Sequence, residues 1–369
     1  MTPIFVYGTL RYAPLLRVVA GADVTPVTAR LPGHIVSHAG DEPYPRLDVG
    51  AGHAEGLLIP AEHAARLDYY EGSFGYVRRA VVVEAASGPV EAQAYFPDSA
   101  DVPAPGGPWL LSHWEEAWGK LAVLTASEAM EYFGEIDGAT LAARMPMIQT
   151  RAWTQVLAEE GMAPATLGPV PTLDIQMVDR RRPYTHFFSV IEADLRQPRF
   201  DGTLSPTVNR AALIAADAVV VLPYDPARDR VLLIQQFRVV PLFRGDPHCF
   251  LVEAVAGRID PGESPDAAAR RELLEEASLT AETLHLISRN YPSSGACTEY
   301  VHTYVAITDL PDGAEGMGGL AEENEDIRSH ILPYTEFETM LDAGQLNVGP
   351  LIIAGHWLAR NRERLRSEA

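Results

Sequence analysis

The stretch GRIDPGESPDAAARRELLEEAS, residues 257–278, decides how the rest of the chain is interpreted. Ser264 and the proline after it are typical of a helix start, because the serine side chain caps free backbone N–H groups and proline fits the first helical position. On that helix Glu272, Glu275 and Glu276 lie at positions i, i+3 and i+4. The spacing therefore places three carboxylates on one helix face.

Carboxylates this close repel one another. Two unit charges about 5 Å apart repel by about 3 kcal/mol at an effective dielectric constant of 20. A hard divalent cation would remove that repulsion, and Mg²⁺ and Mn²⁺ prefer oxygen ligands and bridge phosphates. The pattern predicts a Mg²⁺ (or Mn²⁺) site on this helix. The alternative is an exposed acidic helix on which Arg271 pairs with Glu275.

The spacing of Gly257, Glu263 and the run Arg271–Glu276 resembles the Nudix box. That box is the metal-binding loop–helix–loop of hydrolases that cleave nucleoside diphosphates linked to another moiety. One position departs from the family, because Ser278 stands where the family has glycine. The glycine usually closes the helix in a left-handed conformation, and serine there costs about 1 kcal/mol.

A second acidic segment, GLAEENEDIR, occupies residues 319–328. By itself it would be a solvated run of charge. It resembles the catalytic loop of bacterial ADP-ribose pyrophosphatases, and the resemblance implies that Glu323 is the general base and Glu325 a metal ligand. Together with Glu272, Glu275 and Glu276, Glu325 would complete the carboxylate ligands.

The same resemblance runs from about Pro183 to the C-terminus. It implies a metal-binding backbone carbonyl at Ala256 and substrate contacts by Arg210, Arg238, Ser293, Glu299 and Phe187. The Ser293 loop lacks the proline of the family's Ser-Pro-Gly loop. Phe187 falls on an aromatic residue that stacks the adenine from the partner subunit, so a homodimer through this half is expected. Simple core packing of Tyr184 and Phe187 is the alternative.

The first hundred residues carry a different set of motifs. FVYGTL at residues 5–10 is a short strand that runs into a turn, and residues 67–72, 76–79 and 91–96 follow it. In that order they resemble the γ-glutamyl cyclotransferase fold, a small closed β-barrel. The resemblance implies substrate binding by Tyr7, Gly8, Thr9 and Leu10 and proton transfer by Glu71. A docking or regulatory role without turnover is the alternative.

Composition excludes several classes of protein. The chain of 369 residues has a net charge of −21, which repels nucleic acids and anionic membranes. Two cysteines are too few to stabilise a chain of this size by disulfide bonds, which favours a reducing cytoplasm. The longest apolar stretch, residues 211–222, is far shorter than the roughly 20 residues of a membrane span. The N-terminus has no basic leader, so we expect a cytoplasmic protein without a secretory signal.

Two joints rich in proline and glycine, residues 97–108 and 162–174, divide the chain. We expect a β-barrel cyclotransferase-like domain over residues 1–100, a helical connector over 101–173 and a Nudix domain over 174–369. The fold class is α/β (α+β), with an α/β/α sandwich in the last part.

The connector contains two candidate helix starts and one candidate break. Ser112 with Glu115, and Thr125 with Glu128, both fit the capping box, in which side chains satisfy free backbone donors. Pro146 should kink or split the last helix.

The resemblance to ADP-ribose pyrophosphatases implies a Mg²⁺-dependent hydrolase that converts ADP-ribose to AMP and ribose 5-phosphate. The alternatives are a Nudix hydrolase of another nucleotide sugar or dinucleotide, and a stress-response module that binds ADP-ribose without turnover. A cyclotransferase-like domain ahead of such a Nudix domain resembles bacterial proteins labelled as tellurite-resistance-associated.

Overall fold

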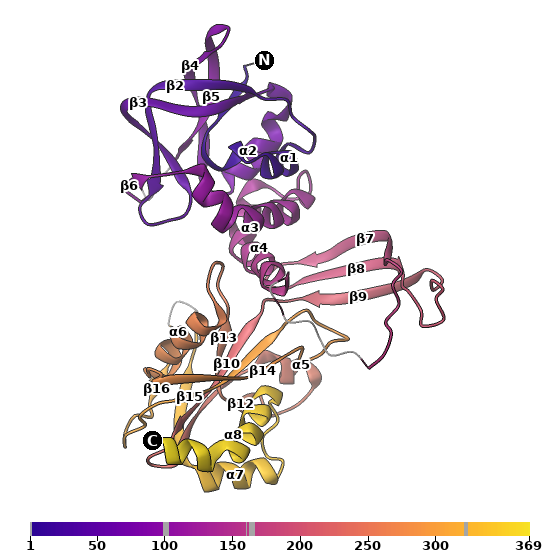
Figure 1. The fold of residues 1–369 in the computed structure, drawn as a ribbon, viewed down its shortest axis with the longest axis vertical. Coiled ribbons are helices and arrows are strands. Elements are labelled where there is room, and N and C mark those ends of the chain that lie inside the picture. The colour runs from indigo at the N-terminus through magenta and orange to yellow at the C-terminus, as the bar shows by residue number, and fades with distance from the viewer. Residues whose placement is uncertain (1, 99–102, 160, 162–166, 321–323) are drawn as a thin grey trace. The chain divides into compact units, whose positions relative to one another are not determined.

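The computed structural model describes residues 2–98, 103–159, 161, 167–320 and 324–369. Contacts along the chain define two compact units, Met1–Met162 and Ala163–Ala369 (Figure 1). The helices expected to form a connector lie in the first unit, together with the strands before them. A division into independently folding parts at residues 100 and 173 stays a prediction.

The first unit contains a closed five-stranded β-barrel, which confirms the expected fold. Its strands follow the order β3-β1-β5-β4-β2, and β2 pairs with β3 to close the ring. All neighbours are antiparallel except β1 and β5. The strands are β1 Ile4–Val6, β2 Val27–Ala39, β3 Pro45–Ile59, β4 Tyr76–Ala85, β5 Gly88–Pro97 and the short β6 Pro105–Pro108, which pairs with β2.

A tightly packed interior holds the barrel together. Phe5 is fully buried with Leu31 and Leu47, which face inward from β2 and β3. A Cβ on Gly56 would lie 2.3 Å from the Phe5 ring, so only glycine allows this ring to lie against β3. The helices of the unit are η1 Gly8–Arg11, α1 Ala13–Ala20, η2 Ala61–His63, α2 Ala64–Gly72, α3 Leu111–Glu131 and α4 Gly138–Glu159.

The helices α3 and α4 correct two sequence predictions. The helix α3 begins without a side-chain capping bond and runs unbroken through Thr125, so neither predicted capping box starts a helix there. The helix α4 continues through Pro146, which lies at an exposed position, so the predicted split is wrong and the predicted kink stays a prediction. A buried ion pair joins the two helices, with Arg151 Nε 3.2 Å from Glu128 Oε1.

The second unit combines a large mixed sheet with a smaller antiparallel one. The large sheet has the order β14-β15-β10-β11-β17-β16, with β12 on β11 and β13 on β10, and only β10 and β15 are parallel. The smaller sheet has the order β7-β8-β9. The strands are β7 Gln176–Thr185, β8 Ser189–Arg196, β9 Val208–Ile214, β10 Ala218–Asp225, β11 Arg230–Phe237, β12 Phe250–Glu253, β13 Val255–Arg258, β14 Thr283–Asn290, β15 Val301–Ile307, β16 Met317–Gly318 and β17 Ile327–Pro333.

Helices cover both faces of the large sheet, which confirms the expected α/β/α sandwich. Val220 and Leu222 of β10 pack with Leu351 and Leu358 in one core cluster. Val221 points to the opposite face, on the side where α6 packs against β10 and β13. The helices are α5 Val239–Arg244, α6 Pro265–Ala277, α7 Tyr334–Asp342 and α8 Gly349–Glu368. Among the described helices, none combines the length and apolar character needed to cross a membrane.

Candidate active site

The helix α6 carries the carboxylate face, and both of its ends have defined geometry. Ser264 Oγ accepts a hydrogen bond from the Ala267 N–H at 3.2 Å, and Pro265 takes the first helical position. Ser278 closes the helix with φ 54° and ψ 33°, the left-handed conformation that the family's glycine adopts without strain. A serine there costs about 1–2 kcal/mol.

Two of the helix carboxylates are buried. The residues Glu272 and Glu276 are 8% and 2% exposed. Gly257 makes room for the first of them, since a Cβ there would lie 1.9 Å from Glu272 Oε1. Burial raises the pKa of Glu272 to about 7, although Arg271 lowers it. Burial also raises the pKa of Glu276 to about 8, although a hydrogen bond from the Ala256 N–H at 3.0 Å lowers it.

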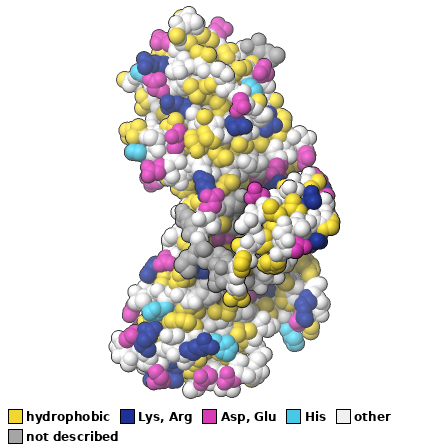
Figure 2. Space-filling view, turned by 45° about the vertical axis from the view of Figure 1, so that its right-hand side comes forward, with side chains coloured by type: hydrophobic (Ala, Val, Ile, Leu, Met, Phe, Trp, Pro, Cys, Tyr) yellow, Lys and Arg dark blue, Asp and Glu magenta, His cyan; other side chains and the backbone are white. Residues whose placement is uncertain are grey.

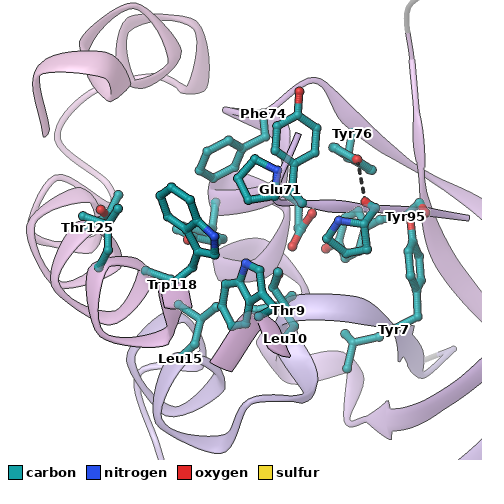
Figure 3. A pocket seen from close by; sticks show the side chains of 18 of the residues that line it. Tyr7, Thr9, Leu10, Leu15, Glu71, Phe74, Tyr76, Tyr95, Trp118 and Thr125 are labelled. Atoms are coloured by element: carbon teal, nitrogen blue, oxygen red, sulfur yellow. Dashed lines mark hydrogen bonds between the residues drawn. The ribbon is translucent and has the colours of Figure 1, made fainter. Parts of the chain in front are cut away.

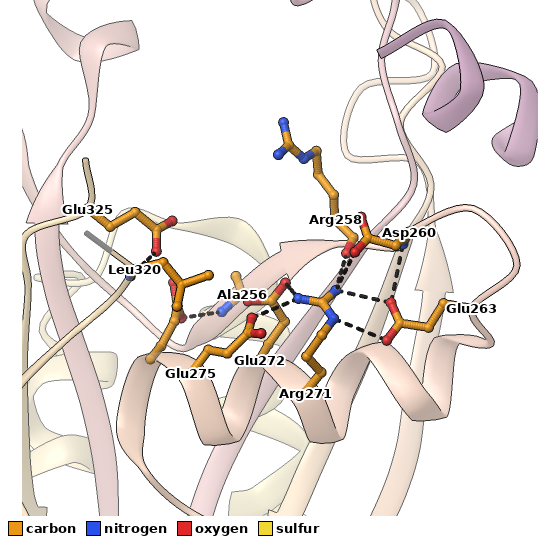
Figure 4. A network of polar contacts seen from close by, with 10 residues as sticks. Ala256, Arg258, Asp260, Glu263, Arg271, Glu272, Glu275, Leu320 and Glu325 are labelled. Carbon is orange, nitrogen blue, oxygen red and sulfur yellow. Dashed lines mark hydrogen bonds and ion pairs between the residues drawn. The ribbon is translucent and has the colours of Figure 1, made fainter. Parts of the chain in front are cut away.

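Arg271 is the cation that holds this face together. Its Nη1 donates to Glu272 Oε1 at 2.7 Å and to Glu275 Oε2 at 2.9 Å (Figure 4). Nε and Nη2 donate to the two Glu263 oxygens at 3.1 and 3.0 Å, and Nη2 also donates to the Arg258 carbonyl at 2.9 Å. The Arg271–Glu275 pair of the alternative prediction is therefore present, but within a half-buried network rather than on an exposed helix.

The acidic loop reaches α6 through β16. A Cβ on Gly318 would lie 2.0 Å from the Glu276 carbonyl oxygen, so this strand passes directly against the end of the helix. Glu325 Oε2 accepts from the Leu320 N–H at 3.2 Å, and its charge contributes to the raised pKa of Glu276. The structure thus brings Glu325 to the helix carboxylates. The predicted base, Glu323, lies outside the described residues.

Arg238 is a second cation whose charge acts on the helix carboxylates. Its Nε and Nη2 donate to Glu253 Oε2 at 3.1 and 2.7 Å. Burial lowers the pKa of Arg238, but the hydrogen bonds to Glu253 and the charges of Glu276 and Glu325 raise it overall. Burial raises the pKa of Glu299, and Arg238 lowers it. Arg238 and Glu299 therefore belong to the same site as the helix carboxylates.

Sequence reasoning missed Glu253. It is the last residue of β12, pairs with Ile234 of β11 and is 7% exposed. The one available signal was an acidic residue at the end of an apolar run just ahead of the box. Ala256, three residues later, donates its N–H to Glu276, and a metal-binding role for its carbonyl stays a prediction.

The remaining predicted contacts lie on loops and on the small sheet. The Ser293 carbonyl accepts from the Ala296 and Cys297 N–H groups, and this loop hydrogen-bonds to Leu213 of β9 at 2.9 Å. Arg210 is exposed on the same strand and donates to the Asn209 carbonyl at 2.8 Å. The structure places Arg210 and Ser293 on segments that meet, without a described contact from either to the helix carboxylates.

Phe187 lies at the box of its own chain. The Arg258 guanidinium lies 4.9 Å from the centre of the Phe187 ring. Tyr184 and Phe187 are 55% and 46% exposed, so simple core packing, the alternative for these rings, is wrong. Stacking of an adenine by Phe187 in a partner subunit stays a prediction.

The carboxylates of this site fit a divalent cation by their chemistry, although their side chains are not arranged around one point. Within the described ranges, no three His, Cys, Asp or Glu side chains are grouped so as to hold a metal ion. Arg271 instead bridges Glu272 and Glu275. The donors are all carboxylate oxygens, which Mg²⁺ and Mn²⁺ prefer. Two of them are buried, where the charged form is unfavourable without a cation.

The first unit contains a separate cavity (Figure 3). The predicted residues Tyr7, Thr9, Leu10 and Glu71 all line it, and burial raises the pKa of Glu71 to about 8. Gly8 does not line it. At φ +67°, a Cβ on Gly8 would lie 2.3 Å from the ring of Pro45, so this glycine allows the strand β3 to approach the loop.

Comparison with known families agrees with both expected domains. Residues 215–351 match the NUDIX domain model, and residues 4–114 match the model for "Gamma-glutamyl cyclotransferase, AIG2-like". The chain is 34% identical over 195 residues to an ADP-ribose pyrophosphatase of Escherichia coli K12, a match that covers 53% of this chain and 92% of the relative. The chain belongs to the Nudix family.

Other Nudix relatives differ in the substrate that they are named for. An ADP-ribose pyrophosphatase of Haemophilus influenzae is 31% identical over 52% of this chain and 89% of its own length. A GDP-mannose pyrophosphatase of Cronobacter sakazakii is 34% identical over 31% of this chain and 59% of its own length. The crystal structure of an ADP compounds hydrolase matches with a TM-score of 0.40 and 20% identity, over 53% of this chain and 98% of that one.

Gly257→Ala tests the geometry of the carboxylate face. The added Cβ displaces the Glu272 carboxylate, so the rise in melting temperature on adding MgCl₂ should fall by more than about half, because a cation stabilises only the state that binds it. Gly295→Ala is the matched control, since a Cβ there meets no atom within 4 Å. Equal Mg²⁺ responses in the two variants would contradict the assignment.

Glu71→Gln tests the half-buried acid of the first unit. A folded-state pKa of about 8, above the ordinary 4.5, means that folding favours the protonated form. The stabilisation is complete below about pH 4.5 and is lost as the pH rises to 8. We expect the variant to match the wild type at pH 4.5 and to exceed it by about 2–4 kcal/mol at pH 8.

Urea unfolding followed by tryptophan fluorescence measures this difference, because four of the five tryptophans lie in the first unit. Glu84→Gln, at an exposed position of β4, is the control and should follow the wild type at both pH values. The same Glu71→Gln protein should retain hydrolysis by the second unit within about twofold. If the variant and the wild type show the same pH dependence of stability, the raised pKa assigned to Glu71 is contradicted.

Proposed function

We propose that the second unit hydrolyses ADP-ribose to AMP and ribose 5-phosphate with the help of Mg²⁺ or Mn²⁺. One observation carries the proposal: the buried carboxylates Glu272 and Glu276, the loop acid Glu325 and the cation Arg238 meet at one place in a Nudix domain. The relatives that match most of this half are named ADP-ribose pyrophosphatases.

The proposed reaction breaks the phosphoanhydride bond of the substrate. A water oxygen bonds to phosphorus, the bridging oxygen leaves with the other phosphate, and protons pass to the base and to solvent. Glu323 is proposed to take the proton from the water. Glu272, Glu275, Glu276 and Glu325 would hold the cation, which when bound neutralises the diphosphate and polarises the water.

Arg238 is proposed to bind the diphosphate. The Arg238 side chain is 41% exposed, while the side chain of Glu253 is 9% exposed. Glu253 accepts from Nε and Nη2 and leaves Nη1 of the guanidinium for another partner. A guanidinium binds phosphate oxygens in a planar, bidentate way. Arg210, Ser293, Glu299 and Phe187 are proposed to contact the rest of the substrate.

Two other functions would use the same fold. A hydrolase for another nucleotide sugar would keep the carboxylates and Arg238 and change the contacts around Arg210, Glu299 and Phe187. A module that only binds ADP-ribose would not need a buried carboxylate pair at the end of a helix. The presence of Glu272 and Glu276 at 8% and 2% exposure favours catalysis.

Glu323→Gln and Glu276→Gln separate the base from the metal ligands. Glu323→Gln should lower kcat by about 10²–10⁴ and leave the Mg²⁺ requirement unchanged. Glu276→Gln should lower the rate and also raise the Mg²⁺ concentration for half-maximal activity. Both are read from initial rates of AMP formation over a MgCl₂ series.

The melting temperature of Glu276→Gln gives an independent check. Without metal the variant should melt at or above the wild type, because a crowded buried carboxylate has lost its charge. With saturating Mg²⁺ the order should reverse, since the cation stabilises the folded wild type more. If Glu323→Gln keeps its turnover, the base lies elsewhere, and if neither variant matters, the hydrolase proposal fails.

We also propose that the second unit forms a homodimer. Apolar side chains of β7 and of the turn between β7 and β8 are exposed, among them Met177, Val178, Tyr184, Phe187 and Phe188. Apolar side chains on the molecular surface appear beside basic and acidic ones in Figure 2. Burying such a group of apolar side chains in a symmetric interface is favourable.

Light scattering at micromolar concentration should give a mass twice the 40.2 kDa of one chain. Charged substitutions at two exposed positions, Met177→Glu with Val178→Glu, should shift the protein toward the monomer. The control is a similar pair of charges at the exposed Val49 and Val82 of the first unit. A wild-type mass equal to that of one chain would contradict the proposed homodimer.

For the first unit we propose a second function, the cyclisation of γ-glutamyl amides. The supporting observation is that Glu71 faces a cavity together with the Tyr7–Leu10 loop, with a pKa near 8 that suits a group which exchanges protons at neutral pH. The wild type should release 5-oxoproline from a γ-glutamyl amide, and the Glu71→Gln variant should not. No release by the wild type would contradict the proposal.

A further inference from the structure

The cavity of the first unit extends beyond Glu71 toward α3. Its volume is 240 Å³, near the lower end of the roughly 300–1,000 Å³ range of small-molecule pockets, so its occupant is small. Figure 3 shows Tyr7 and Tyr95 on one side of Glu71 and Trp118 and Thr125 on the other. The cavity therefore extends past Glu71 to α3.

One face of α3 forms a wall of this cavity, called here the α3 wall. The lining residues follow a helical spacing of i, i+4, i+7, i+8 and i+11, and they are Trp114, Trp118, Leu121, Ala122 and Thr125. All but the first lie beyond residue 114, where the match to the cyclotransferase family ends. This wall is thus added to the part of the chain that the family shares.

The chemistry of the wall favours a flat apolar group. Indole rings at Trp114 and Trp118 offer planar surfaces that pack well against another ring. The α3 residues that line the cavity include no acidic side chain, so an amine part with a positive charge would lose its hydration without gaining a partner there.

Thr125 is the last residue of this wall along α3. The residue is 2% exposed, and its hydroxyl oxygen is buried without a hydrogen-bond partner among the described residues. The residue lines the cavity, but the hydroxyl oxygen itself has almost no accessible surface, so Thr125 meets an occupant through its carbon atoms.

We propose that the α3 wall makes the first unit select γ-glutamyl amides whose amine part is a planar apolar group, with the glutamyl part at Glu71 and the amine part against Trp114 and Trp118. The inference rests on the proposed cyclisation at Glu71. In that reaction the α-amino nitrogen bonds to the γ-carbonyl carbon, the bond from this carbon to the amine nitrogen breaks, and the free amine leaves with a proton. No oxidant or reductant is needed.

The test compares two probes that share the glutamyl part, L-γ-glutamyl anilide and L-γ-glutamyl methylamide. Calorimetric titration of the full chain gives both affinities, and 5-oxoproline is assayed in the same samples. Where 5-oxoproline forms, kcat/KM replaces the affinity in the comparison. Burial of a phenyl ring in place of a methyl group should favour the anilide by at least about tenfold.

Variants at two tryptophans assign the preference to the wall. Trp118→Ala should reduce the preference for the anilide to less than about threefold and change the methylamide value by no more than about twofold. Trp118→Leu, which keeps an apolar side chain but no ring, serves if the alanine variant fails to fold. Trp153→Ala is the control, because Trp153 is half-buried on α4 and does not line the cavity.

The outcomes separate the inference from the function on which it rests. Equal values for the two probes in the wild type, or a preference that survives Trp118→Ala and Trp118→Leu, would overturn the inference and leave cyclisation standing. A protein that neither binds nor cyclises either probe overturns both. A preference lost equally in Trp118→Ala and Trp153→Ala also overturns the inference, since the wall would then act only through folding.

Discussion

Burial of two like charges at the end of one helix is the constraint on which the second unit depends. Glu272 and Glu276 lie one helical turn apart, almost without solvent, and burial raises both pKa values. Two neighbouring residues accommodate these carboxylates. The Glu272 carboxylate occupies the space that a side chain at position 257 would need, so this position requires glycine. Arg271 compensates part of the negative charge of Glu272.

The site is assembled from elements that are distant in sequence. The helix supplies the carboxylates, β16 brings Glu325 to the helix end, and β12 aligns Glu253 beneath Arg238. Glu272 accepts a hydrogen bond from Arg271, and the charge of Arg238 acts on Glu276, but both arginines are shared with other carboxylates. A divalent cation and an anionic diphosphate complete such a set of charges, since the cation binds the carboxylates and the phosphates together.

Local motifs were predictable, and contacts between distant segments were not. The bounds of α6 and its carboxylate face followed from a capping serine, a proline and a spacing of three and four residues. Glu253 was missed because its role depends on a strand pairing with β11 that no local pattern encodes. Thr125 and Pro146 were misinterpreted for the opposite reason, because local cap and break signals were overridden by the packing of two long helices around the Glu128–Arg151 pair. The barrel followed from the order of its motifs, while the α3 wall of its cavity did not.

The central claim is that this carboxylate face hydrolyses ADP-ribose, and its most direct test is a comparison of two substrates. The whole protein with MgCl₂ is given ADP-ribose or GDP-mannose, the substrate for which other relatives are named, and nucleotide products are separated by chromatography. The account predicts AMP and ribose 5-phosphate in equal amounts and a kcat/KM at least about tenfold higher for ADP-ribose. An equal or higher kcat/KM for GDP-mannose, or no AMP from ADP-ribose at any Mg²⁺ concentration, would contradict it.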